Sequence, residues 1–171
     1  YEGRNIILSQ GFLLQCDQLR PKSKGSITLK SDNPKESPNS FFNYLSHPHD
    51  ITELREAFKK MNELIAQPAF DEYRGKRIKP SPDLKNNSDI DNWIRETATT
   101  DYHPSGTCKM GKGPDAVVDQ NLKVYGFDNL YVVDASVMPD VVSGNLNAPT
   151  QMIAEKASDI ILNNTPLKPV Q

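Results

Sequence analysis

The sequence is poor in the residues that build cysteine or histidine sites. Its 171 residues include two cysteines and three histidines. Cys16 and Cys108 lie far apart and form no C-x-x-C pair, so a zinc site made of cysteines is excluded, whereas one disulfide stays open. The histidines are too scattered along the chain to indicate a metal site. We therefore expect chemistry that needs no protein-bound metal ion.

Long apolar runs and an excess of positive charge are also missing. No apolar run approaches the roughly 20 residues of a membrane span, and the net charge of −2 gives no sign of a nucleic-acid or anionic-membrane partner. Residues 1–4 hold neither an initiator methionine nor a signal-peptide pattern, so we expect an internal fragment. Thirteen prolines predict long ordered loops.

Alternating apolar residues predict several short strands. Residues 5–19 are expected to form one or two strands broken at a glycine, and residues 26–30 a strand antiparallel to them. Residues 31–40 contain two prolines and are expected to be a loop. Residues 116–118 and 122–124 are typical of short strands around a turn.

Apolar residues at helical spacing predict two helices in the middle of the chain. The first is expected to begin at Asp50, with Glu53 in capping-box spacing, and to end at Pro68. Its apolar stripe is expected to lie in the core rather than to bind a cofactor. A shorter helix capped by Ser88 follows. Strands and helices together predict an α+β chain.

The last third begins with a nearly continuous apolar run, residues 129–134, that ends in Asp134. Such a run suits a strand buried on both faces of a parallel sheet. An acid at its carboxyl end would lie where ligands bind, and a turn or cap role is the alternative. Pro149, in the favoured first turn, predicts a final helix over about 149–162.

Residues 102–111, Tyr-His-Pro-Ser-Gly-Thr-Cys-Lys-Met-Gly, are the strongest candidate for a reactive site. Pro104 keeps His103 out of a helix, and Gly106 permits a positive φ or a close approach to a flat group. A histidine suits proton transfer near neutral pH. A single loop histidine is more often a surface residue, but a second unusual stretch, residues 143–150, favours the catalytic interpretation.

Two other patterns compete in this region. Residues 111–116 fit G-x-G-x-x-A, the dinucleotide-binding pattern, but no strand precedes them and Pro114 interrupts them. Cys108 lies five residues after His103 and could be the nucleophile of a cysteine enzyme. No third group that would orient the histidine is evident for that alternative.

Three stretches, in this order, resemble the glucose–methanol–choline (GMC) oxidoreductases. They are residues 103–111, 130–139 and 144–156. Weaker similarity continues through residues 25–29, 42–46 and 67–75. The pattern looks most like the choline dehydrogenase branch. The resemblance covers nearly the whole chain, but only the carboxyl-terminal part of such an enzyme.

The resemblance implies two domains. Residues 1–110 would belong to an α+β substrate domain, with an antiparallel sheet backed by helices, and would carry the histidine loop. Residues 111–171 would return to an FAD-binding Rossmann-like domain with the strand at 129–134 and the final helix at about 149–162. The glycine fingerprint that holds the FAD pyrophosphate is not in this sequence, so the resemblance implies a missing amino-terminal FAD-binding half.

The resemblance also implies an activity, the oxidation of a primary alcohol by hydride transfer to FAD, with choline-like alcohols among the candidates. His103 would handle the hydroxyl proton. Asn145, ten residues before Glu155, would orient the alcohol oxygen. Asn147 competes for that role, although the resemblance places it at the flavin ring.

The remaining positions would contact the cofactor. Asp134 and Ala135 resemble the family's contacts to the FAD chain, and Pro149 and Thr150 open a helix whose positive end would face the electron-rich part of the flavin. A different class of function stays open, a non-catalytic interaction module that keeps this fold. The sequence leaves open the alcohol and the electron acceptor.

Overall fold

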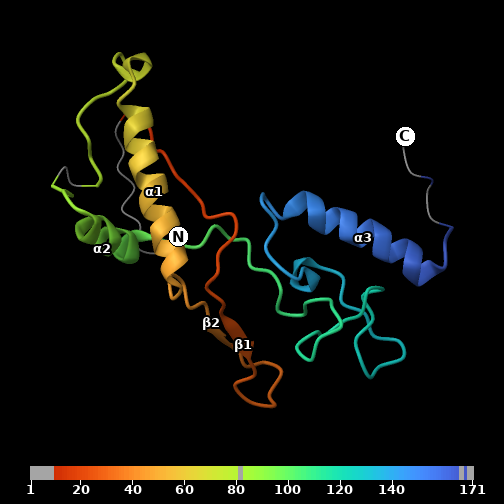
Figure 1. Ribbon diagram of the computed structural model, residues 1–171. Helices are drawn as coiled ribbons and strands as arrows, with labels where there is room; N and C mark the ends of the chain where they lie inside the picture. The colour runs from red at the N-terminus through yellow and green to blue at the C-terminus, as the bar shows by residue number, and fades with distance from the viewer. Residues whose placement is uncertain (1–9, 81–82, 166–167, 169–171) are drawn as a thin grey trace. The chain divides into compact units, whose positions relative to one another are not determined.

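The computed structural model describes residues 10–80, 83–165 and 168, and it divides into two compact units (Figure 1). Unit 1 contains residues 10–18 and His47–Thr99. Unit 2 contains Leu19–Ser46 and the described residues from Thr100 onward. Every site residue that the sequence predicts therefore lies in unit 2. The assignment of residues 1–110 and 111–171 to two enzyme domains stays a prediction.

Unit 1 is built on two helices that pack against each other. α1 spans Pro48–Ile65 and α2 spans Asn87–Thr97 (Figure 1, yellow and green). The core between them consists of four buried apolar side chains, Ile51, Phe58, Ile90 and Ile94. The rings of Phe58 and Trp93 have centroids 5.4 Å apart. The part of the predicted apolar stripe formed by Ile51 and Phe58 therefore lies in the core, whereas Leu64 near its end is 50% exposed.

The start of α1 differs from the capping box that the sequence predicted. His47 is the N-cap, and its Nδ1 accepts a hydrogen bond from the His49 amide at 3.1 Å. Asp50 is buried inside the helix and accepts a 2.9 Å hydrogen bond from Gln18 Nε2. Pro48 fits the first helical turn because its missing N–H would be unpaired there anyway. The helix therefore begins two residues before Asp50.

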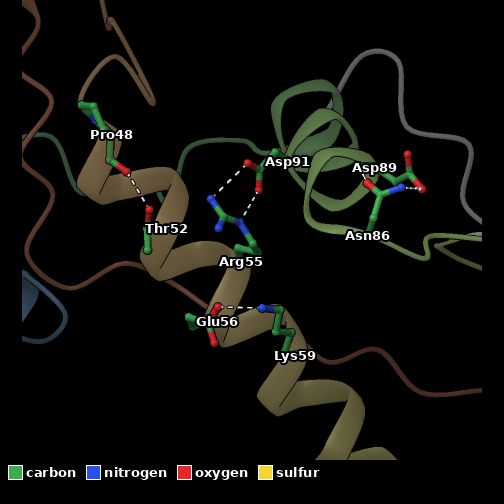
Figure 2. Close-up of polar contacts among 8 residues, drawn as sticks. All are labelled: Pro48, Thr52, Arg55, Glu56, Lys59, Asn86, Asp89 and Asp91. Atoms are coloured by element: carbon green, nitrogen blue, oxygen red, sulfur yellow. Dashed lines mark hydrogen bonds and ion pairs between the residues drawn. The ribbon is translucent and has the colours of Figure 1, made fainter.

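The cap of α2 is Asn86 rather than Ser88. Asn86 Oδ1 accepts a 2.9 Å hydrogen bond from the Asp89 amide, and Asn86 Nδ2 donates at 3.0 Å to the Asp89 carboxylate (Figure 2). This reciprocal pair satisfies one of the free amides of the first turn. Figure 2 also shows the contact that joins the helices, where Arg55 meets Asp91 with two nitrogens.

Unit 2 contains a two-stranded antiparallel sheet. β1 (Ser26–Thr28) pairs with β2 (Asn39–Phe41). The predicted pairing of the first strand with residues 5–19 is wrong within the described residues, because residues 10–19 hold no strand, and residues 5–9 lie outside them. β2 falls at the end of the expected loop. The two strands are joined by residues 29–38.

The core of unit 2 lies beneath α3, which spans Asn147–Leu162. Four buried side chains form it, Val118, Leu122, Val137 and Ala157. Isolated bridges hold the irregular chain there, namely Met110–Val118, Val118–Val124 and Lys123–Tyr131. The predicted short strands around a turn are thus single bridges. Among the described helices, none is long and apolar enough to cross a membrane.

Residues 129–134 do not form the predicted strand. The segment makes one antiparallel bridge through Tyr131, and the Val132 amide donates to the Leu122 carbonyl at 3.1 Å. The described residues offer it no parallel neighbour, so a strand buried on both faces cannot form. The short 3₁₀ helix η2 (Ala135–Val137) then ends the extended run.

Candidate active site

The histidine loop, residues 101–111, has two left-handed backbone positions, with φ of 62° at Tyr102 and 82° at Gly106. Glycine adopts such a φ freely, whereas a tyrosine does so at a cost of about 1–3 kcal/mol. The Tyr102 amide donates to Thr100 Oγ1 at 3.0 Å, which helps to hold the strained residue. A defined backbone conformation therefore stands directly before His103.

The His103 side chain is 30% exposed, and its Nε2 lies 3.8 Å from Asp101 Oδ2. As the sequence predicted, the residue lies outside any helix and is followed by Pro104. The structure therefore pairs one ring nitrogen with an acid two residues upstream. Asp101 is not among the site residues that were predicted from the sequence. Within the described parts of the chain, no group of three or more metal-ligating side chains is placed to hold a metal ion.

Backbone hydrogen bonds join the histidine loop to the segment that follows residues 129–134. The Cys108 amide donates to the Ser136 carbonyl at 3.0 Å, and the Met110 amide donates to the Val137 carbonyl at 2.8 Å. A Cβ added at Gly106 would lie 3.3 Å from another carbonyl oxygen of that segment. Two of the three stretches that resemble the GMC family therefore lie side by side.

Asp134 caps η2, because its Oδ1 accepts a 2.7 Å hydrogen bond from the Ser136 amide. A cap role was the predicted alternative to a ligand contact. The carboxylate is exposed and has a second oxygen, whereas Ala135 is partly buried. A contact of these two residues with a cofactor stays a prediction.

The second predicted stretch opens α3. The helix begins at Asn147, two residues before the expected start, and its N-cap residue Leu146 makes no side-chain cap. Pro149 is its third residue, and Thr150 Oγ1 donates back to the Leu146 carbonyl at 2.7 Å. The N-cap residue therefore offers no side-chain acceptor to the first-turn amides, which carry the positive end of the helix dipole.

Asn145 and Asn147 are both exposed beside this helix start. Asn147 Oδ1 accepts a 3.1 Å hydrogen bond from Gln151 Nε2, which leaves its amide nitrogen able to donate. Among the described residues, no hydrogen bond or ion pair joins either asparagine to His103. The geometry therefore does not decide which of the two asparagines orients the alcohol oxygen.

The cysteine alternative gains no support from the structure. Cys108 is a free thiol that is partly buried. In the described part of the chain, no hydrogen bond joins it to His103, and its amide is already engaged with Ser136. A nucleophile activated by a base needs the two side chains within hydrogen-bond reach.

A hollow of about 410 Å³ in unit 2 does not contain the predicted site. It is lined by Met110, Gly111, Lys112, Asp119, Gln120 and Tyr125. Met110 and Gly111 end the stretch at 102–111, but none of the six lining residues is a residue that was given a catalytic or cofactor-binding role. The predicted residues are instead exposed or partly exposed on unit 2.

The fold and the loop motifs define an oxidoreductase class. The family model of the GMC oxidoreductases matches residues 21–154, and the chain belongs to this family. This confirms the family resemblance and the α+β fold class that the sequence predicted.

Curated relatives narrow the comparison to one branch. The chain is 44% identical over 173 residues to oxygen-dependent choline dehydrogenase 1 of Chromohalobacter salexigens, covering 100% of this chain and 31% of that protein. It is 46% identical over 167 residues to the oxygen-dependent choline dehydrogenase of Ectopseudomonas mendocina, covering 98% of this chain and 30% of that protein. The chain thus spans under a third of the relatives' length.

Solved structures of two oxidases and an FAD-dependent oxidoreductase are also similar to the chain. Pyridoxine 4-oxidase from Mesorbium loti matches with a TM-score of 0.79 at 30% identity, over 86% of this chain and 29% of that one. The formate oxidase of Aspergillus oryzae, a protein with FAD modification, matches with a TM-score of 0.80 at 29% identity, over 85% and 26%. An FAD-dependent oxidoreductase from Chaetomium thermophilum matches with a TM-score of 0.78 at 27% identity, over 85% and 25%.

Proposed function

We propose that this chain is the carboxyl-terminal part of an FAD-dependent oxidoreductase that oxidises a primary alcohol, with choline-like alcohols as the first to test. One observation carries the proposal. The loop of the partly exposed His103 is hydrogen-bonded to the segment at 134–137, so the residues proposed for proton handling and for cofactor contact share one framework. The choline dehydrogenase relatives support the substrate class.

The residues present fit an FAD. The uncapped first turn of α3 and the free amide nitrogen of Asn147 offer donors to an electron-rich ring. Ser105, two residues after His103, has a buried hydroxyl without a hydrogen-bond partner among the described residues, so this chain leaves one donor of the loop unused. We propose that five residues hold the cofactor, namely Asp134, Ala135, Asn147, Pro149 and Thr150. When bound, FAD supplies the hydride acceptor.

The chain's own residues would handle the substrate. Oxidation of an alcohol removes a hydride from carbon and a proton from the hydroxyl group. His103 takes this proton as a general base, and the Asn145 amide donates to the alcohol oxygen and fixes its direction. An asparagine amide cannot accept the proton, so the two residues have separate tasks.

The proposal includes an amino-terminal FAD-binding part. The chain spans 31% and 30% of two choline dehydrogenase relatives, and its sequence holds no glycine fingerprint for the pyrophosphate. Residues 1–110 would then belong to the substrate domain. Residues 111–171, with the helix at about 149–162, would complete the FAD-binding domain.

The substitution His103→Ala in the full-length enzyme tests the proposal. We expect kcat to fall about 10²–10⁴-fold, the usual contribution of a general base, while FAD stays bound. His49→Ala is the matched control, because His49 pairs with Glu53 in unit 1. A loss below threefold at saturating substrate would contradict the role of His103.

Two single variants distinguish the roles of Asn145 and Asn147. Asn145→Ala should lower kcat/KM for the alcohol, whereas Asn147→Ala should change the flavin spectrum or redox potential. The reverse result would exchange the two roles. A full-length protein without flavin absorbance and without alcohol oxidation would favour the non-catalytic interaction module instead.

A further inference from the structure

We propose that the hollow of unit 2 binds a small zwitterion, a molecule that carries both a carboxylate and a methylated ammonium group. Its volume of about 410 Å³ is within the range of about 300–1,000 Å³ that is typical of small-molecule sites. Two of the six lining residues, Lys112 and Asp119, carry opposite charges. The inference does not depend on the proposed function, because no residue with a proposed role in alcohol oxidation lines the hollow.

The two charges do not neutralise each other, although both residues line the same hollow. Among the described residues, neither Lys112 nor Asp119 forms an ion pair. Asp119 Oδ1 accepts hydrogen bonds from the Asn121 amide at 2.8 Å and the Lys123 amide at 3.0 Å, whereas no hydrogen bond in the described chain engages Oδ2. One carboxylate oxygen and one ammonium group of the lining residues are therefore available to a ligand.

Two further lining residues supply an amide and an aromatic ring. The Gln120 side chain is exposed and has no hydrogen-bond partner in the described part of the chain, so its amide can donate to a carboxylate. Tyr125 is 49% exposed, and an aromatic face attracts a methylated ammonium group. The cationic end of the ligand would thus contact Asp119 and Tyr125, and its carboxylate would contact Lys112 and Gln120.

Hydrogen bonds hold the walls of the hollow in place. The Tyr125 hydroxyl donates to the Gly111 carbonyl at 2.7 Å, and the Tyr125 amide donates to the Val117 carbonyl at 3.1 Å. The Gly111 amide donates at 3.1 Å to the carbonyl of Val118, a fully buried core residue. Because these contacts exist without a ligand, binding has less conformational entropy to remove.

The lining charges favour a zwitterion over a ligand with a single charge. A simple anion would be attracted by Lys112 and repelled by Asp119, and a simple cation would meet the reverse. A zwitterion pairs with both residues. Since Lys112, Gln120 and Tyr125 are all exposed, each contact is partly screened by water, and we expect a Kd of about 0.1–10 mM.

Saturation-transfer difference NMR on the full-length protein tests the inference, because it detects weak ligands of large proteins. The probe is glycine betaine, whose methyl protons should receive saturation and whose titration should give a Kd in the expected range. Two matched compounds separate the contributions of its groups. The anion 3,3-dimethylbutanoate has the same shape without the positive charge, and glycine has both charges without the methyl groups. Both should bind more weakly than glycine betaine.

Three variants locate the bound probe. Lys112→Gln and Tyr125→Leu should each weaken the binding of glycine betaine about 3–10-fold. Asp119→Asn should do the same, while its Oδ1 still accepts the two amide hydrogen bonds. The controls are Lys76→Gln in unit 1 and Asp128→Asn elsewhere in unit 2, both exposed, and they should leave the Kd within twofold.

Three results would overturn the inference. One is the absence of saturation transfer at about 20 mM glycine betaine. The second is equal affinity for 3,3-dimethylbutanoate, which would show that the positive charge is not recognised. The third is binding that Lys112→Gln and Asp119→Asn leave unchanged, which would place the probe outside the hollow. Both substitutions alter only the charge of a lining residue, so they decide the matter even if Tyr125→Leu fails to fold.

Discussion

The ion pair between Arg55 and Asp91 should be the strongest polar coupling in unit 1. Arg55 Nε lies 2.6 Å from one carboxylate oxygen of Asp91, and Nη2 lies 3.1 Å from the other (Figure 2). The pair joins α1 to α2. We predict that it couples the two helices by about 1–2 kcal/mol of unfolding free energy.

The magnitude follows from burial and geometry. Fully exposed pairs contribute about 0–1 kcal/mol, and breaking a buried pair costs about 3–5 kcal/mol. Arg55 and Asp91 are 17% and 25% exposed, which is between these cases, and their two-point geometry is favourable. Lys60 and Glu63 provide the matched control, because they are 77% and 62% exposed on one face of α1. Their coupling should be about 0.2–0.5 kcal/mol.

A double-mutant cycle with Arg55→Gln and Asp91→Asn, followed by urea denaturation, measures the coupling. Trp93 is the single tryptophan of the chain and contacts Phe58 between the helices, so its fluorescence reports on this unit. Added salt should weaken the control pair more than the Arg55–Asp91 pair. Equal coupling energies in the two cycles would refute the reasoning.

Three further outcomes are expected from urea denaturation and thiol chemistry of the chain. Gly106→Ala should destabilise unit 2 by about 1–2 kcal/mol, because the φ of Gly106 is 82°. Gly144→Ala should leave the stability unchanged, because a Cβ added at Gly144 has nothing within 4 Å. Equal effects of the two substitutions would contradict this prediction. Asn86→Ala should cost unit 1 about 1 kcal/mol through the lost helix cap, and an unchanged stability would show that the cap is dispensable. Burial raises the pKa of the Cys16 thiol. At about pH 8, Cys16 should therefore react more slowly with a thiolate-specific reagent than free cysteine does, and its rate should still rise at higher pH. A rate equal to that of free cysteine would exclude the shift.

The helices were the most predictable part of the fold, because their apolar stripes do not depend on distant residues. Their caps were less predictable. Asp50 has the sequence signature of a cap, but a hydrogen bond from Gln18, 32 residues away, accompanies its burial inside α1. His47 is an unusual cap residue, and Asn86 was overlooked in favour of the serine two positions later. Long-range contacts and equivalent neighbouring candidates cannot be separated from sequence alone.

The extended segments were harder to predict for another reason. An apolar run at 129–134 favours a strand, but a strand requires a partner, and the described chain offers only one antiparallel bridge. In the candidate site, the histidine loop stood out through its one proline and two glycines. Asp101 did not, because its approach to His103 accompanies a left-handed conformation at Tyr102 that a tyrosine does not predict.

The two hydrogen bonds from the histidine loop to η2 also have a thermodynamic consequence. Because the amides of Cys108 and Met110 donate to carbonyls at Ser136 and Val137, the loop and η2 restrain each other's motion. A ligand that orders one of them lowers the entropy still to be lost when a second ligand orders the other. Such cooperativity is reciprocal, so each ligand would change the affinity for the other by the same factor, whichever binds first and without any direct contact between them.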